Sequence, residues 1–214
     1  MANERKICMI IGSAPVTGGK LPGDVSPEDC YVICADGGMD TAARMGITPD
    51  LIVGDFDSAQ TLPPENVETI QLPVEKDETD MLYAVKEGFR RGFSNFVLLG
   101  GLGGQRFDHS IANLCVLSYI ADRSGRAVLA DGSTSVFMLA SGRLVFTELK
   151  GATLSVFPFG VGSCTVSYKG LQYPLTNYAL SLNDALGVSN CIVEDRAEVL
   201  LHQGRALVIL EEEV

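Results

Sequence analysis

Two aspartates, Asp55 and Asp57, follow directly on the apolar run of residues 51–53, in a segment that reads Gly-Asp-Phe-Asp-Ser. Side chains two residues apart in extended backbone project to the same side, and two close carboxylates repel each other unless a cation lies between them. Proteins commonly hold Mg²⁺ with one or two carboxylates together with phosphates and water. The spacing therefore indicates a magnesium site, and the alternative is a solvated acidic turn.

A further acidic segment, residues 75–80, opens the helix that is predicted over residues 79–91. A helix N-terminus attracts acids and a threonine cap, so capping alone explains part of this segment. Lys76 is harder to explain as a cap, and it can pair with a phosphate. Asp80 belongs to the first turn of the predicted helix, where its carboxylate can face the same cation as the two earlier aspartates.

Two glycine segments each follow a predicted strand and precede a predicted helix. In the first, Asp36, Gly37 and Gly38 either let the backbone approach a phosphate at a helix N-terminus or form only a tight turn. The second, residues 100–104, has four glycines in five residues and can wrap a polyphosphate through backbone N–H groups. Arg106 adds a planar cation suited to phosphate oxygens.

The second glycine segment runs into a predicted helix start that carries an acid and a histidine. A histidine at such a place is more often a structural hydrogen-bond donor than a base. The candidate ligand-contacting residues of this segment are Gly101, Gly103, Gly104, Arg106, Asp108 and His109.

The elements that must position these residues alternate between strand and helix up to about residue 140. Apolar runs predict strands over residues 6–11, 31–35, 51–53, 67–72, 96–99, 127–130 and 135–139, and helical spacing predicts helices over 39–45, 79–91 and 107–122. Such alternation predicts a mostly parallel, doubly wound sheet. Ligands bind at the carboxyl ends of strands in these sheets, and all four segments lie where a predicted strand ends or a predicted helix begins.

From residue 143 onward the runs are short, β-like and separated by turn residues. The expected strands are residues 144–149, 153–159, 165–168, 178–182, 191–193, 198–201 and 206–210. This pattern predicts an all-β, sandwich-like C-terminal domain. We therefore expect an α/β domain over residues 1–140 and a β domain over residues 141–214.

Composition limits the partners. The 214-residue chain has a net charge of −11 and no basic run, which argues against nucleic acid and anionic membranes. No segment approaches the ~20 apolar residues of a membrane span. The six cysteines form no Cys-x-x-Cys pair, which favours buried free thiols and a cytoplasmic location.

Carboxylates, one lysine, one arginine and glycine loops at one sheet edge are typical of phosphoryl transfer by charge neutralisation and positioning. The G-x-x-x-x-G-K-[ST] loop is absent, so this is not a P-loop enzyme. At this level of detail the sequence closely resembles the thiamine pyrophosphokinase family. The matching segments are residues 35–38, 49–58, 76–80, 100–109, 170–175 and 187–190.

The resemblance implies the transfer of a pyrophosphoryl group from ATP to thiamine, giving thiamine diphosphate and AMP, with Mg²⁺ as cofactor. It implies an α/β domain that binds ATP and magnesium, a β domain that binds thiamine, and a homodimer with active sites at the subunit interface. By the family pattern Asp55, Asp57 and Asp80 serve the magnesium or ATP site, Arg106 contacts phosphate and Asp108 lies on the substrate side.

The remaining family positions are assigned to binding. They are Asp36, Gly37, Gly38, Lys76, Asp77, Thr79, Gly101, Gly103, Gly104, His109, Tyr173, Ser189 and Asn190. Tyr173 replaces the tryptophan common in the family, so an aromatic face survives with a different size. Two alternatives stay open: a related diphosphokinase that acts on another heterocyclic alcohol such as a pterin, and a non-catalytic nucleotide or thiamine sensor.

Overall fold

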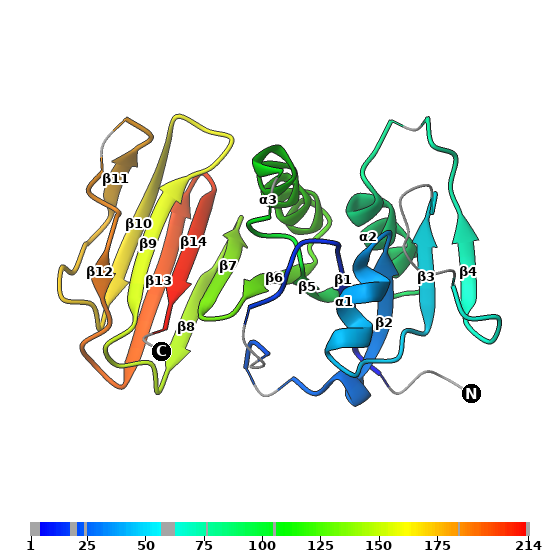
Figure 1. Cartoon of the computed structure of the whole chain (residues 1–214). Coiled ribbons are helices and arrows are strands. Elements are labelled where there is room, and N and C mark those ends of the chain that lie inside the picture. Colours follow the sequence, from blue (N-terminus) through cyan, green and yellow to red (C-terminus); the bar gives the residue numbers. More distant parts are fainter. Residues whose placement is uncertain are drawn as a thin grey trace. The chain divides into compact units, whose positions relative to one another are not determined.

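The computed structural model describes residues 5–17, 21–23, 25–56, 63–75, 77–104, 106–183 and 185–212 (Figure 1). The chain divides into two compact units, residues 1–132 and 133–214. The sequence pattern had assigned residues 135–139 to the first domain. The structure places them in strand β7 (Thr134–Leu139), which pairs with β14 (Ala206–Glu211) of the second unit and so belongs with it.

The first unit is built on parallel strands in the order β6-β5-β1-β2-β3-β4. Every neighbouring pair in this order is parallel, as the alternating pattern predicted. A short 3-10 helix, Pro27–Asp29, precedes β2. The strands are β1 (Ile7–Ile11), β2 (Cys30–Ala35), β3 (Leu51–Gly54), β4 (Glu68–Gln71), β5 (Asn95–Leu99) and β6 (Arg126–Asp131).

Three helices cover the two faces of this sheet, α1 (Gly38–Arg44) on one and α2 (Asp80–Arg90) with α3 (Phe107–Asp122) on the other (Figure 1). From β1 the chain moves along the sheet through β2 and β3 to β4, and it then returns to the other side of β1 for β5 and β6. Parallel strands in known proteins are almost always joined by right-handed crossovers, which place helices on both faces when the chain moves both ways from the first strand. Because both faces are covered, the central strands are buried on both sides and read as continuous apolar runs. Met9 and Ile11 lie in the same core cluster as Met39 of α1.

The second unit is a sandwich of two antiparallel sheets, as predicted. Within this unit the strands of one layer have the order β12-β9-β14-β7 and those of the other β11-β10-β13-β8. Buried and half-exposed residues alternate along β9, so that Leu154 and Val156 share one core cluster with Val166 and Val199 of the facing sheet. Besides β7 and β14, the sandwich consists of β8 (Arg143–Thr147), β9 (Thr153–Pro158), β10 (Ser163–Lys169), β11 (Tyr178–Ser181), β12 (Asn190–Cys191) and β13 (Arg196–Gln203).

No helix in the described part of the chain is both long enough and apolar enough to cross a lipid bilayer.

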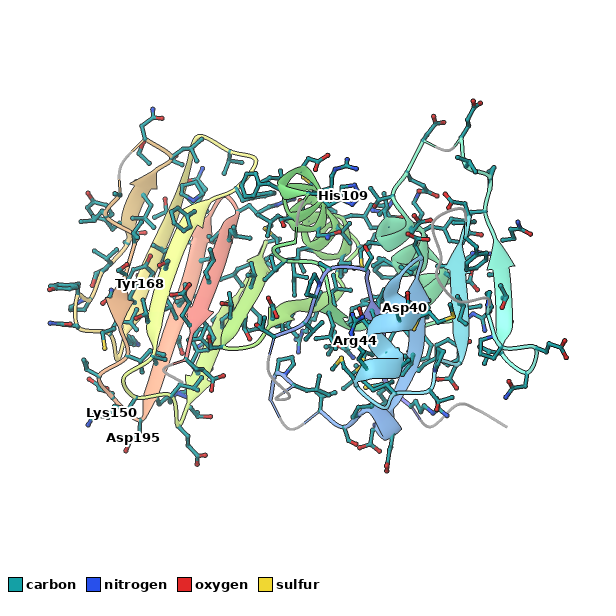
Figure 2. The ribbon with its side chains drawn as sticks, viewed as in Figure 1. Asp40, Arg44, His109, Lys150, Tyr168 and Asp195 are labelled. Carbon is teal, nitrogen blue, oxygen red and sulfur yellow. The ribbon has the colours of Figure 1, made fainter. Side chains whose placement is uncertain are left out.

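The sandwich core encloses the hydroxyl of Tyr168 (Figure 2), for which no described residue provides a hydrogen-bond partner. Burial raises the pKa of this hydroxyl. A buried hydroxyl without a partner costs about 1 kcal/mol or more. Tyr168→Phe should therefore raise Tm by about 3 °C in a thermal melt. Tyr178→Phe, at an exposed site, should leave Tm unchanged, and a lower Tm for Tyr168→Phe would contradict the assignment.

Candidate functional site

A cavity of about 510 Å³ opens in the first unit at the carboxyl ends of β1, β2 and β5. Its wall is formed by residues 12–15 after β1, residues 35–36 after β2, residues 79–81 at the start of α2, and residues that follow β5. The chain leaves β1 toward β2, whereas β5 lies on the other side of β1. The cavity therefore lies at the topological switch point, where doubly wound sheets bind their ligands.

Predicted site residues from three separate sequence segments line this one cavity. His109 lies at the start of α3, in the first turn of that helix (Figure 2). The predicted residues in the cavity wall are Asp36, Thr79, Asp80, Gly101, Gly103, Gly104, Arg106 and His109. The parallel sheet brings them together because the carboxyl ends of its strands share one edge.

The loop after β1 is a part of the site that the sequence analysis missed. The N–H of Gly12 donates to the Leu99 carbonyl at 2.8 Å, and the N–H of Ala14 donates to the Gly100 carbonyl at 3.0 Å. A Cβ on Gly12 would lie 2.6 Å from the Gly100 oxygen, so the two loops approach as closely as glycine allows. The sequence does carry a sign of this loop, because the first apolar run ends in a glycine that is followed by Ser-Ala-Pro.

The far end of this loop is fastened to the end of β6. Thr17 donates both its N–H and its hydroxyl to one carboxylate oxygen of Asp131, at 2.6 and 2.9 Å. Asp131 thereby holds the β1 loop across the edge of the sheet from outside the cavity. Nothing in its sequence surroundings distinguishes it as a functional residue.

The turn after β2 has an unusual backbone at Asp36, whose φ of 48° lies in the left-handed region. Aspartate tolerates this region better than most residues, and such conformations cluster at functional sites. Gly37 and Gly38 are not among the described residues that line the cavity. A Cβ on Gly38 would lie only 1.8 Å from the Ile11 oxygen, so this glycine is required for packing α1 on β1.

The predicted magnesium ligands are only partly described. Asp55 directly follows β3 and is half-buried, whereas Asp57 lies outside the described residues. Phe56, directly after Asp55, has a φ of 59°, which is left-handed and not extended, so the common direction of the Asp55 and Asp57 side chains stays a prediction. The described residues hold no group of three His, Cys, Asp or Glu side chains arranged for a metal.

The acidic segment before α2 contains a helix cap, which the alternative interpretation of this segment had predicted. Thr79 is the N-cap, and its hydroxyl accepts a hydrogen bond from the Leu82 N–H at 3.3 Å. Asp80 is the first residue of the helix and belongs to the cavity wall. Asp77 is exposed, and Lys76 lies outside the described residues.

Arg106 and Asp108 form an exposed pair at the start of α3. The guanidinium donates to both carboxylate oxygens of Asp108, at 2.9 and 2.5 Å. The hydrogen bonds from Arg106 lower the pKa of Asp108 to about 2, so this carboxylate stays charged at neutral pH. A phosphate that binds Arg106 must therefore replace or share this partner.

Asp50 belongs to a family segment but lies at the opposite edge of the sheet. Its carboxylate accepts hydrogen bonds from Arg5 at 2.6 Å and from the Val32 N–H at 2.9 Å. The resemblance at this position therefore reflects how β1, β2 and β3 are joined at their amino ends.

In the second unit the structure joins the two family segments. Asn190 is buried, and its side-chain amide hydrogen-bonds to the backbone of Tyr173. It accepts from the Tyr173 N–H at 3.0 Å and donates to the Tyr173 carbonyl at 2.8 Å. Ser189 has a φ of 56°, and its N–H donates to the Ser155 hydroxyl at 3.0 Å. Tyr173 itself is 63% exposed. Asn190 thus positions a loop that presents the tyrosine ring.

Known proteins match both units. The family model described as "Thiamin pyrophosphokinase, catalytic domain" matches residues 24–129, and the one described as "Thiamin pyrophosphokinase, vitamin B1 binding domain" matches residues 144–205. "Thiamine pyrophosphokinase 1" of Oryza sativa subsp. japonica is 26% identical over 197 residues, which cover 78% of this chain and 74% of the relative. "Thiamine pyrophosphokinase" of Bacillus subtilis (strain 168) is 25% identical over 188 residues, covering 85% and 87%.

The crystal structure of thiamine pyrophosphokinase from Bacillus subtilis matches with a TM-score of 0.83 at 24% identity, over 98% of this chain and 100% of that one. This likeness shows a common fold. The two family models match consecutive parts of the sequence and together span most of it. The chain therefore belongs to the thiamine pyrophosphokinase family.

Proposed function

We propose that this chain transfers the pyrophosphoryl group of ATP to the hydroxyl of thiamine, giving thiamine diphosphate and AMP. The observation that carries the proposal is that one cavity at the switch point gathers glycine backbone, carboxylates and an arginine from three motifs. Glycine loops at a helix start suit a polyphosphate, and carboxylates beside it suit the metal that accompanies one.

In the proposed reaction the thiamine hydroxyl gives up its proton, which ends in solvent, and its oxygen bonds to the β-phosphorus while the bond from that phosphorus to the bridging oxygen breaks and AMP leaves. Negative charge then increases on the bridging and non-bridging oxygens. We assign the N–H groups of the glycine loop and the Arg106 guanidinium to those oxygens, because preorganised donors lower the barrier of such reactions. Asp108, paired with Arg106, fixes where that guanidinium lies before ATP arrives.

We assign Mg²⁺ to Asp55, Asp57 and Asp80. The assigned donors are all carboxylate oxygens, which suit Mg²⁺, and Asp80 lines the cavity. When bound, the ion neutralises charge on the phosphate oxygens. Asp36, at the end of the neighbouring strand, adds a further carboxylate to the same wall.

We assign thiamine binding to the second unit, in a homodimer with active sites at the subunit interface. The second unit exposes large apolar side chains, among them Tyr173, Leu182 and Val188, at 63, 58 and 41%. Exposed apolar groups of this kind favour a partner surface or an organic ligand. The cytoplasmic location stays a prediction from cysteine usage.

The direct test is incubation of the protein with ATP, Mg²⁺ and thiamine, followed by chromatographic separation of the products. We expect AMP and thiamine diphosphate in equal amounts. A parallel reaction with a hydroxymethyl pterin in place of thiamine tests the second substrate class, and should give no AMP. Release of ADP would contradict pyrophosphoryl transfer, and thiamine binding without turnover would indicate a sensor.

The arginine of the proposed site can be tested by Arg106→Lys. Lysine keeps the charge but loses the planar fork that holds two oxygens. We therefore expect a lower kcat and a higher KM for ATP, so that kcat/KM for ATP falls about 10-fold or more. The side chain is 67% exposed, so Tm should stay within a few degrees. Arg126→Lys, at the other edge of the sheet, is the control, and wild-type kinetics for Arg106→Lys would remove the residue from the site.

A further inference from the structure

Two buried side chains of α3 hold the carbonyl groups of the glycine loop. The Asn113 amide nitrogen donates to the Gly101 oxygen at 2.9 Å, and the Ser110 hydroxyl donates to the Gly103 oxygen at 3.3 Å. Both side chains are 7% exposed, and they lie three residues apart on one face of the helix. Alternate residues of the loop are therefore tied to α3.

Tying a carbonyl also orients the next N–H group. The carbonyl of one residue and the N–H of the following one belong to the same planar trans peptide and point in opposite directions. With the Gly101 and Gly103 oxygens held on α3, the N–H groups of Leu102 and Gly104 are turned away from that helix. Gly103 and Gly104 have φ values of 67° and 77°, a conformation that glycine adopts without strain.

The cavity borders the glycine loop where α3 holds it, since Gly103, Gly104 and Asn113 all belong to the cavity wall. The loop also needs glycine where it meets Asn113. A Cβ on Gly101 would lie 3.0 Å from the Asn113 amide nitrogen and 2.8 Å from a methyl group of Leu129. The spacing between the loop and α3 thus leaves room for the hydrogen bond and for no side chain.

We propose that Ser110 and Asn113 are positioning residues that aim the N–H groups of Leu102 and Gly104 at the phosphates of ATP. This inference rests on the proposed function, because it takes ATP to bind in this cavity. It adds two residues that lie beyond the motif ending at His109. Their role is to set the loop's donors before the nucleotide binds.

The test compares Asn113→Asp, Ser110→Ala and the double variant Ser110→Ala/Asn113→Ala with the wild-type full chain. Asn113→Asp keeps the shape of the side chain but replaces the donor with a charged acceptor facing a carbonyl oxygen. Binding of α,β-methylene ATP, whose α–β bridge cannot be cleaved, is measured by calorimetry with Mg²⁺ and without thiamine. KM values for ATP and thiamine and the Tm are measured alongside.

We expect Asn113→Asp and the double variant to bind the ATP analogue about 10-fold more weakly, the size of effect that losing one or two hydrogen bonds produces. KM for ATP should rise in parallel, while KM for thiamine stays unchanged and Tm moves by no more than a few degrees. Ser110→Ala should show a smaller change in the same direction. Asn95→Ala, an exposed asparagine at the opposite edge of the sheet, should behave as wild type.

Other outcomes overturn the inference or the proposed function separately. If the wild-type chain binds no ATP analogue, the proposed function itself fails. If the wild-type chain binds it and the double variant binds it equally well, only the positioning role fails. A fall in Tm together with equal losses for ATP and thiamine would identify a purely structural role. If Asn113→Asp does not fold, the two alanine variants decide the question.

Discussion

Asp80→Asn is expected to lower kcat at least ~100-fold at saturating Mg²⁺, because metal-held charge contributes several kcal/mol to such transition states. Asp80 is the first residue of α2 and lines the cavity, and Thr79 caps the helix beside it. Asparagine has nearly the same size and leaves the Thr79 cap in place, so the helix should form as before. Steady-state kinetics over a range of Mg²⁺ concentrations, with a melting curve, measure both effects.

The matched control is Asp29→Asn, an exposed aspartate in the short helix before β2. It removes the same charge from the far side of the first unit and should leave kcat unchanged. Near-normal turnover of Asp80→Asn at saturating Mg²⁺ would remove Asp80 from the metal site. Asp57→Asn, which the sequence places in the same set of ligands, should behave as Asp80→Asn does.

Gly38→Ala should be the most destabilising small substitution at this edge of the sheet. The new Cβ would lie 1.8 Å from the Ile11 oxygen and 2.6 Å from the Ile11 carbonyl carbon, and both are backbone atoms of the neighbouring strand. Relief requires that α1 or the end of β1 move, which we expect to cost about 3 kcal/mol or more, the upper end of overpacking effects. For a chain of this size that lowers Tm by about 10 °C.

Gly162→Ala provides the control, because Gly162 has no neighbouring atom within 4 Å of the added Cβ and no positive φ. Its Tm should equal or slightly exceed that of the wild type. Thermal melts followed by circular dichroism compare the two variants directly. A Gly38→Ala protein with wild-type Tm would mean that α1 can lift from β1 at little cost, and that Gly38 is not required for packing.

Several features of the site could be predicted because they are local. Each predicted motif lies where a buried strand ends or a helix begins, and a parallel sheet brings such places to one edge whatever the details of packing. The helix predicted over residues 107–122 is observed as α3, with Arg106 at its N-cap. The capping role of Thr79 was likewise visible in the sequence, since caps depend only on neighbouring residues.

Other features depended on contacts between residues far apart in the chain. Strand β7 has the composition of another strand of the first unit, but its partner β14 begins 67 residues after β7 ends, so only the paired structure assigns it. Phe56, next to Asp55, takes a left-handed conformation that its residue type alone does not indicate.

The sequence by itself determined the family, the parallel sheet, the sandwich and the segments that approach the cavity. These follow from hydrophobic periodicity, glycine spacing and short motifs, all of which act over a few residues. Only the tertiary structure showed that Gly12 and Asn113 line the cavity and that Asp131 and Ser110 hold the loops beside it. Their roles come from hydrogen bonds and close approaches between separate elements, such as the 2.9 Å bond from Asn113 to Gly101, and no local pattern in the sequence specifies which distant backbone group a side chain will meet.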